Sequence, residues 1–136
     1  MIDKIEIQEA LSLYHEAASK FDFEQLSLAF LPDGIWEVPG MGIFSQGRDN
    51  IRSTMSALMT PIEYLVQINA PAVTVVEGDA ASARSLIRES AKFRNHPGLV
   101  DVVGQYVDEL KRTPDGWKFA RRTFTIIGTH RSAEMS

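Results

Sequence analysis

The sequence contains no cysteine, and this absence excludes several kinds of chemistry together. Disulfide bonds, thiolate nucleophiles and cysteine-ligated metals cannot occur. Histidine is also scarce, since the chain has only His15, His96 and His130, and their separation matches no metal-ligand spacing. There is no G-x-G-x-x-G motif or phosphate-binding loop. We therefore expect neither a metal ion nor another cofactor.

Long hydrophobic runs and an excess of basic residues are missing as well. No apolar run approaches the ~20 residues of a membrane span, and no signal peptide is visible. The 14 Lys and Arg residues are interspersed among 18 Asp and Glu residues, which gives a net charge of −4. Nucleic-acid binding needs a clustered basic face, so nucleic acid and membranes are not expected partners. The sequence predicts a soluble, cytoplasmic protein.

The chain of 136 residues is the size of one domain, so we predict a single domain over residues 1–136. A chain of this length buries roughly two thirds of its unfolded surface and needs no disulfide or metal to hold it together. The last residues, 131–136, are expected to be frayed.

Apolar residues recur at helical spacing in the first half of the chain. They predict an amphipathic helix over residues 3–20. Asp22 followed by Gln25 is a capping-box pattern that predicts a second, short helix, which ends at Pro32. A third helix is predicted from Arg48 or Asp49 to a point before Pro61.

The second half of the chain has the patterns of strands separated by turns. A short strand is predicted at residues 35–38, and longer ones at 64–70, 73–76, 82–95, 102–110 and 117–127. Helices followed by an antiparallel meander indicate the α+β class. The natural solution is a strongly curved, mostly antiparallel sheet that wraps around the long first helix and leaves an open-ended cone.

The two last strands are joined by Pro114-Asp115-Gly116, a sequence typical of a tight turn. Simple alternation predicts that Trp117, Phe119, Arg121 and Thr123 face one side of the sheet, and that Lys118, Ala120, Arg122 and Phe124 face the other. Apolar residues then lie on both faces, which favours a homodimer formed by packing of sheet on sheet. The alternative is an outer face kept in water by its charged residues.

Several local motifs occur in the order found in one known family. They are Tyr14 in the first helix, the segments 30–36, 47–51 and 78–81, and the closing hairpin formed by 106–110 and 115–122. With this layout, which covers residues 7 to 127, the chain resembles the SnoaL-like proteins of the nuclear-transport-factor-2-like superfamily. The resemblance implies an α+β cone with a mostly apolar interior cavity, often dimeric through the sheet.

The resemblance extends to the branch that contains scytalone dehydratase and hexachlorocyclohexane dehydrochlorinase, in which an Asp and a His act together as a general base. Counting along the motifs, the Asp position falls on Ser19 and the His position on Gln67, or on Val66 if the register slips by one. A serine cannot stabilise an imidazolium, and an amide cannot take a proton. The usual acid–base dyad is therefore missing from this sequence.

Other residues of the first helix could contribute to function. Tyr14 is interpreted as a pocket residue that could donate a hydrogen bond or a proton, or alternatively as a core tyrosine. His15 and Ser19 are four positions apart and share a helix face, so His15 could act as a base. The alternative for His15 is a surface histidine.

Strand residues supply the remaining candidates for a ligand pocket. Gln67 and Asn69 share one strand face and could recognise a ligand carbonyl or hydroxyl if that face is interior, or could point outward from an edge strand. Trp36 and Phe44 could clamp a flat ligand at the entrance or simply pack.

Charged residues on the long strands are less easily placed. Arg88 and Glu89 must point to opposite faces, and a charge inside the cone would mark a site. Asp101 and Asp108 are candidate bases whose position the sequence leaves open.

The sequence therefore predicts a protein that binds a small hydrophobic or aromatic-ring compound in an apolar cavity. The alternative is a cofactor-free lyase or isomerase that uses Tyr14 with a non-standard base, either His15 or a strand carboxylate. A third possibility is an interaction module that uses its sheet face.

Overall fold

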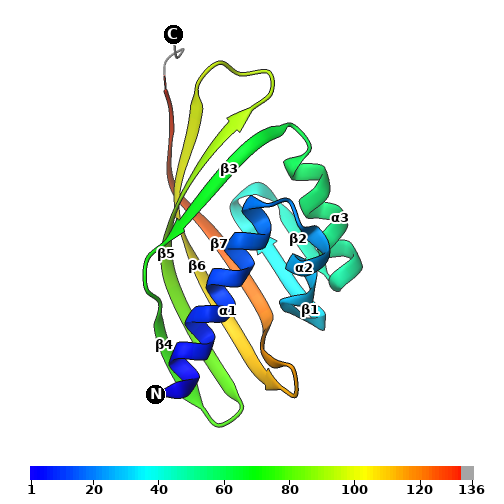
Figure 1. Ribbon diagram of the computed structural model, residues 1–136, viewed down its shortest axis with the longest axis vertical. Helices are drawn as coiled ribbons and strands as arrows, with labels where there is room; N and C mark the ends of the chain where they lie inside the picture. Colours follow the sequence, from blue (N-terminus) through cyan, green and yellow to red (C-terminus); the bar gives the residue numbers. More distant parts are fainter. Residues whose placement is uncertain (133–136) are drawn as a thin grey trace.

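The computed structural model describes residues 1–132 and confirms the α+β arrangement, with helices packed against a curved open sheet (Figure 1). The elements in chain order are α1 (Ile2–Ser19), α2 (Phe23–Leu28), β1 (Phe30–Val38), the 3-10 turn η1 (Pro39–Met41), β2 (Ile43–Gln46), α3 (Arg48–Met59), β3 (Ile62–Asn69), β4 (Val73–Glu77), β5 (Ala80–Phe93), β6 (Leu99–Thr113) and β7 (Gly116–Arg131).

The strands form one sheet in the order β2-β1-β7-β6-β5-β3, and β4 also pairs with β5. Only the β1–β7 pairing is parallel, which agrees with the mostly antiparallel sheet that was expected. Figure 1 shows the long strands curving around α1, with α2, α3 and the β1–β2 ribbon at one side of the opening. The concave face of the sheet is therefore the interior of the molecule.

The helices begin and pack as their patterns indicate. On α1, the buried residues Ile7, Leu11, Tyr14 and Ala18 follow one another at intervals of three and four positions, which places them on the side facing the sheet. The side chain of Asp22 accepts a hydrogen bond of 3.1 Å from the backbone N–H of Gln25, which confirms the predicted N-cap of α2.

Strand β1 starts earlier than residues 35–38, the range that the sequence indicated. It begins at Phe30, directly after α2, and Pro32 lies within it. The pairing of β1 with β7 shifts register between Phe30 and Ile35, so Pro32 sits in an irregular stretch where its missing N–H removes no ladder hydrogen bond. The prediction that the second helix ends at Pro32 is therefore wrong, since α2 ends at Leu28 and Pro32 lies in the irregular first part of β1.

The last hairpin turns where it was predicted, but its alternation is different. Leu110 pairs with Phe119 and Glu109 pairs with Arg121, so Ala120 is an extra residue in β7. Such a β-bulge reverses which side the following residues face. The expected split of the strand into two regular faces is therefore wrong beyond Ala120, and Arg122 joins Phe119 in the interior.

The end of β7 also extends further than predicted. Arg131 pairs with Val100, and the backbone N–H of Ser132 donates to the carbonyl oxygen of Leu99 at 2.9 Å. Residues 131 and 132 are thus paired with β6, and the rest of the expected frayed segment, residues 133–136, lies outside the described part of the chain.

Aromatic rings fill much of the space between α1 and the sheet. Tyr14 of α1 meets Phe30, Tyr106 and Phe119 with ring centroids 5.8–6.2 Å apart in edge-to-face arrangements. Phe124 lies against Gly104, where an added Cβ would come within 2.3 Å of the ring. Glycine at this position lets the core close against β6. Within residues 1–132, the helices all fall short of the length and apolar character that crossing a membrane requires.

Candidate functional site

The interior face of the sheet carries a row of polar side chains under α1. Asp108 of β6 and Arg122 of β7 pair across neighbouring strands, and Gln67 of β3 pairs with Glu89 of β5. His15 of α1 lies between these two pairs and contacts both. Five polar residues from five elements therefore meet inside a largely apolar core.

Arg122 and Asp108 form a fully buried ion pair. The guanidinium Nε donates to Asp108 Oδ1 at 2.9 Å, and both side chains are 0 % exposed. Burial raises the pKa of the Asp108 carboxyl above its ordinary value, and the charge of Arg122 opposes this effect. Breaking such a pair would leave a buried charge without compensation.

Three aromatic rings surround the guanidinium of Arg122. Its Cζ lies 3.7 Å from the ring centroid of Tyr106, 4.3 Å from that of Tyr14 and 4.6 Å from that of Phe119. Contacts of this kind stabilise a cation that has lost its water. Tyr14 is therefore a core residue of this cluster, and burial raises the pKa of its phenol well above the ordinary value.

His15 is buried, with 4 % of its surface exposed, so the surface alternative for it is wrong. Its Nε2 lies 3.4 Å from Arg122 Nη2, and its Nδ1 lies 2.5 Å from Gln67 Oε1. Because a guanidinium can only donate, Nε2 accepts, and the proton of the neutral ring resides on Nδ1.

The protonation state of His15 follows from the same surroundings. Burial, and then the charge of Arg122, lower the pKa of His15 to about 3, although the bond to Gln67 acts in the opposite direction. The ring is thus neutral near pH 7. Both ring nitrogens are already engaged, so the geometry favours a positioning role for His15, and its role as a base stays a prediction.

Glu89 is the carboxylate at the other end of this row. It is half-buried, and burial raises its pKa, an effect that the neighbouring amide of Gln67 opposes. Among residues 1–132, no Lys, Arg or His nitrogen lies within ion-pair distance of Glu89. Its neighbour Arg88 points outward, 3.7 Å from Asp101, so Asp101 lies on the outside and Glu89 on the inside.

The two amides of β3 both face the interior. Val66 and Ile68 are exposed on the outer side, while Gln67 and Asn69 are half-buried on the inner side. This confirms the interior alternative for the two amides. Within the described residues, Asn69 Oδ1 is buried without a hydrogen-bond partner, so this oxygen can accept a hydrogen bond from an O–H or N–H group of a ligand.

Two other predicted pocket residues do not share one site. In the β1–β2 ribbon, Trp36 pairs with Ser45, and Glu37 pairs with Phe44. Adjacent residues of a strand alternate, so Trp36 points inward and Phe44, which is 58 % exposed, points outward. The prediction that Trp36 and Phe44 clamp one ligand is therefore wrong, because they lie on opposite faces of the ribbon. Ser19 lies half-buried at the last position of α1.

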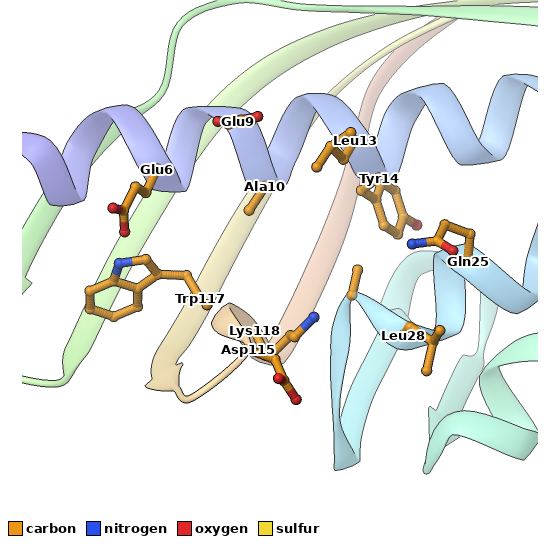
Figure 2. Close-up of a pocket in the computed structure, with 12 residues that line it drawn as sticks. Glu6, Glu9, Ala10, Leu13, Tyr14, Gln25, Leu28, Asp115, Trp117 and Lys118 are labelled. Carbon is orange, nitrogen blue, oxygen red and sulfur yellow. The ribbon is translucent and has the colours of Figure 1, made fainter.

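A groove with a volume of about 400 Å³ lies on another side of α1, between this helix, α2 and the β6–β7 hairpin. Figure 2 shows Trp117 and Tyr14 beside the space below α1, with Asp115 and Lys118 on the side of the hairpin. Of the predicted pocket residues, only Tyr14 lines it. The lining contains both carboxylates and apolar side chains. Its other residues are Glu6, Glu9, Ala10, Leu13, Gln25, Leu28, Ala29 and Gly116.

Sequence reasoning missed the ion pair and the importance of Glu89. Arg122 was assigned to the wrong face because a β-bulge leaves no pattern in the sequence that alternation can detect. Glu89 was recognised as one of two alternatives for an inward charge. The available signal was its position in a run of alternating small and polar residues on β5, whose odd-numbered members face inward: Ala81, Ala83, Ser85, Ile87 and Ala91.

Comparison with known proteins supports the resemblance seen in the sequence. The profile of the SnoaL-like domain family matches residues 1–123. An uncharacterised protein of Mycobacterium tuberculosis (strain H37Rv) is 28 % identical over 124 residues, which cover 90 % of this chain and 84 % of that protein.

Solved structures show the same fold at low sequence identity. A provisionally assigned aromatic ring hydroxylase of Novosphingobium aromaticivorans has a TM-score of 0.88 at 23 % identity, with 96 % of this chain and 93 % of that one covered. A provisionally assigned scytalone dehydratase of the same organism has a TM-score of 0.87 at 20 % identity, covering 100 % and 95 %. A hexachlorocyclohexane dehydrochlorinase of Novosphingobium barchaimii has a TM-score of 0.85 at 15 % identity, covering 95 % and 89 %.

Proposed function

Because the chain belongs to the SnoaL-like domain family, we propose that it binds a small, largely apolar ring compound inside its cone, against the inner faces of β3 and β5. The proteins of similar fold include one named as a scytalone dehydratase and one named as a hexachlorocyclohexane dehydrochlorinase. Fold alone does not specify a ligand, so the proposal depends on the site.

The observation that carries the proposal is a buried amide oxygen without a partner, close to an interior carboxylate without a counter-charge. Asn69 Oδ1 is buried without a partner, and Glu89 lies inside with no cation beside it among the described residues. Buried polar atoms are normally hydrogen-bonded, so the free Oδ1 of Asn69, on a half-buried residue, favours a ligand that donates a hydrogen bond to it. Apolar side chains adjoin them, since Leu65 and Ile87 are almost fully buried on the same strands.

We further propose that the protein is a cofactor-independent lyase or isomerase. Reactions of this type need a proton acceptor and a hydrogen-bond donor at the substrate, and both kinds of group lie in the interior. The predicted acid, Tyr14, has its ring against Arg122, and its pKa is raised well above the ordinary value. Tyr14 would then act by orienting Arg122 and His15 around the substrate.

Ligand-detected and protein-detected NMR would test where a compound binds. We expect that 2-naphthol, a small fused-ring alcohol whose O–H can donate to Asn69 Oδ1, shifts backbone signals of Gln67, Asn69 and Glu89. Asn69→Leu should weaken binding about tenfold, as expected for the loss of one hydrogen bond. The matched control is Leu28→Ala in the outer groove, which should leave binding unchanged. Shifts confined to the groove, or no binding by this compound, would contradict the proposed interior site.

Homodimer formation through the outer face of the sheet is also proposed. The outer face is defined by exposed apolar residues of β3, β5 and β6, namely Ile68, Leu86, Val103 and Val107. Arg88 and Asp101 lie beside them, so two copies related by a twofold axis could pair opposite charges around a shared apolar centre. Because of the β-bulge at Ala120, Phe124 lies in the interior and does not contribute to the outer face. The apolar residues of β3, β5 and β6 form this face instead.

Light scattering coupled to size-exclusion chromatography would measure the mass in solution. The wild-type protein should have the mass of two chains, and Val103→Glu should shift it to that of one, because a charge cannot be buried at the centre of the outer face. Leu13→Glu, at an exposed apolar position of α1, is the control and should remain dimeric. A monomeric wild-type protein would refute the proposal.

A further inference from the structure

The outer groove between α1, α2 and the β6–β7 hairpin is separate from the interior polar row (Figure 2). Its volume of about 400 Å³ lies in the range that is typical of small-molecule sites. Its lining includes exposed residues of all three elements, so a molecule in solution can reach it. Gln67, Asn69 and Glu89 are not among the lining residues. The groove is therefore a second site, distinct from the interior one proposed above.

Contacts outside the outer groove hold its walls in place. Arg112 of β6 donates to Asp3 of α1 at 2.7 Å and to Asp79 at 3.0 Å, which ties the start of the helix to the sheet. The backbone N–H of Phe119 donates to the carbonyl oxygen of Ala29 at 2.9 Å, which joins the end of α2 to β7. The groove is thus formed by fixed elements before a ligand binds, and this lowers the entropic cost of binding.

Carboxylates dominate the charge of the outer groove. Glu6 and Glu9 come from α1 and Asp115 from the hairpin turn, whereas Lys118 is the one basic residue that the described part of the chain contributes to the lining. Within residues 1–132, none of these three carboxylates has a Lys, Arg or His nitrogen at ion-pair distance. Three carboxylates against one ammonium leave an excess of two negative charges, which favours a cationic ligand.

Apolar side chains make up much of the rest of the lining. Trp117 is 5 % exposed, and the guanidinium Cζ of Arg112 lies 4.5 Å from the centroid of its indole, so this ring already stabilises one cation. Leu13 and Leu28 are 56 % and 38 % exposed, and Ala10 lies between the helix and the groove. Covering such apolar surface favours binding. A ligand that complements this groove therefore carries both a positive charge and an apolar body.

We infer that the outer groove binds a small organic cation, a protonated amine joined to an aromatic ring or a short apolar chain. Figure 2 shows Glu6 and Trp117 at one end of the groove and Leu28 at the other. The ammonium group binds at the end with Glu6 and Trp117, and the apolar part extends along Leu13 towards Leu28. This inference does not depend on the proposed function, because the interior ligand is uncharged and contacts β3 and β5.

The placement of the carboxylates favours an organic cation over a metal ion. Within the described residues 1–132, no three His, Asp or Glu side chains converge closely enough to bind a metal. Carboxylates spread along the walls of a groove can instead accept separate N–H bonds from one ammonium group, which has three donors. They also attract the cation through solvent, and salt screens this attraction. An anionic ligand would be repelled by the same carboxylates.

Protein-detected NMR titration with phenethylamine tests the inference. We expect this amine to shift backbone signals of Ala10, Leu13 and Gly116. It should bind about tenfold more tightly than 2-phenylethanol, which has the same ring and chain but no charge, since each exposed charge pair adds a modest amount. An increase of NaCl from about 20 mM to about 500 mM should weaken binding of the amine about three- to tenfold and leave binding of the alcohol unchanged.

Charge-changing variants identify the groups that contact the amine. The double variant Glu6→Gln with Glu9→Gln should weaken binding of phenethylamine about five- to tenfold, and Lys118→Gln should strengthen it about two- to threefold. The two glutamates are exposed, so their replacement leaves the fold intact. Glu63→Gln on β3 removes one carboxylate away from the groove, and this matched control should bind as the wild type does.

The possible results separate this inference from the proposed function. Equal binding of phenethylamine and 2-phenylethanol, unchanged binding in the double variant, or no shift of the groove signals would overturn the inference. Competition between phenethylamine and 2-naphthol, with shifts at Gln67 and Glu89, would place the amine in the interior and overturn it as well. If 2-naphthol does not bind while phenethylamine shifts the groove signals, the proposed function is rejected and this inference is supported.

Discussion

The two halves of the interior polar row are built from similar residues but are organised in different ways. In the closed half, Arg122 and Asp108 are completely buried, in direct contact and covered by aromatic rings. In the open half, Gln67, Asn69 and Glu89 are half-buried, and a carboxylate faces uncharged amides. A buried charge with an opposite charge beside it serves the fold, whereas a partly accessible carboxylate without one is available for chemistry.

His15 connects the halves, since it accepts from Arg122 and donates to Gln67. Its neutral state is what allows this, because an imidazolium would repel the guanidinium. The closed half therefore orients the open half through one uncharged ring. This division of roles predicts that substitutions in the closed half mainly change stability, and that substitutions in the open half mainly change function.

The largest expected effect is on the closed half. Asp108→Asn keeps the shape of the side chain but leaves Arg122 buried without a counter-charge, and should cost about 3–5 kcal/mol of unfolding free energy. Urea denaturation followed by circular dichroism would measure it. Replacing both partners with apolar residues, as in Asp108→Leu with Arg122→Met, should recover much of this loss. A cost below about 1 kcal/mol for Asp108→Asn would show that the pair is not a structural element.

The residue that joins the two halves should make the protein sensitive to acid. The folded-state pKa of His15 is lowered to about 3 from 6.5, so between these pH values only the unfolded chain binds this proton. Stability contributed by neutral His15 is therefore complete above pH 6.5 and is lost as the pH falls, by about 1.4 kcal/mol per pH unit.

Measurement of unfolding free energy at several pH values would check this slope. In His15→Asn, the slope of unfolding free energy against pH between 6.5 and 4 should fall by the amount that corresponds to one bound proton. This change in slope is independent of the effect of the substitution on stability at pH 7. The exposed His130→Asn variant is the control and should keep the wild-type slope. Equal slopes in the wild type and in His15→Asn would contradict a buried neutral ring.

The smallest expected effect has the opposite sign and concerns the open half. Burial raises the folded-state pKa of Glu89, so the folded state is favoured when Glu89 is protonated and loses stability as pH rises through the raised pKa. Glu89→Gln removes this cost and should stabilise the protein at neutral pH by about 0.5–2 kcal/mol. The gain should vanish at a pH below the ordinary Glu pKa, and exposed Glu63→Gln should show no such gain.

The stability of this variant sharpens the comparison of the two halves. A gain in stability at neutral pH would identify Glu89 as a carboxylate that is kept at the expense of the fold. A destabilised Glu89→Gln protein would place Glu89 with Asp108, among the groups that hold the interior together.

The sequence by itself determined the fold class, the order of the elements and the family. Helical spacing on α1, the Asp22 cap and the Pro114-Asp115-Gly116 turn depend on local chemistry, which acts between residues close together in the chain. The sequence also placed Gln67 and Asn69 on one strand face, whereas the assignment of the usual dyad positions to Ser19 and to Gln67 or Val66 stays a prediction.

Only the tertiary structure decided which charges lie inside the cone. The extra residue at Ala120 reverses the alternation of β7 and brings Arg122 against Asp108, and this bulge depends on pairing with β6 rather than on local sequence. The inward direction of Glu89 and the burial of His15 depend in the same way on how the sheet curves around α1. The burial that changes a pKa and the contacts that orient a proton are set by residues far apart in the chain, so no local pattern contains them.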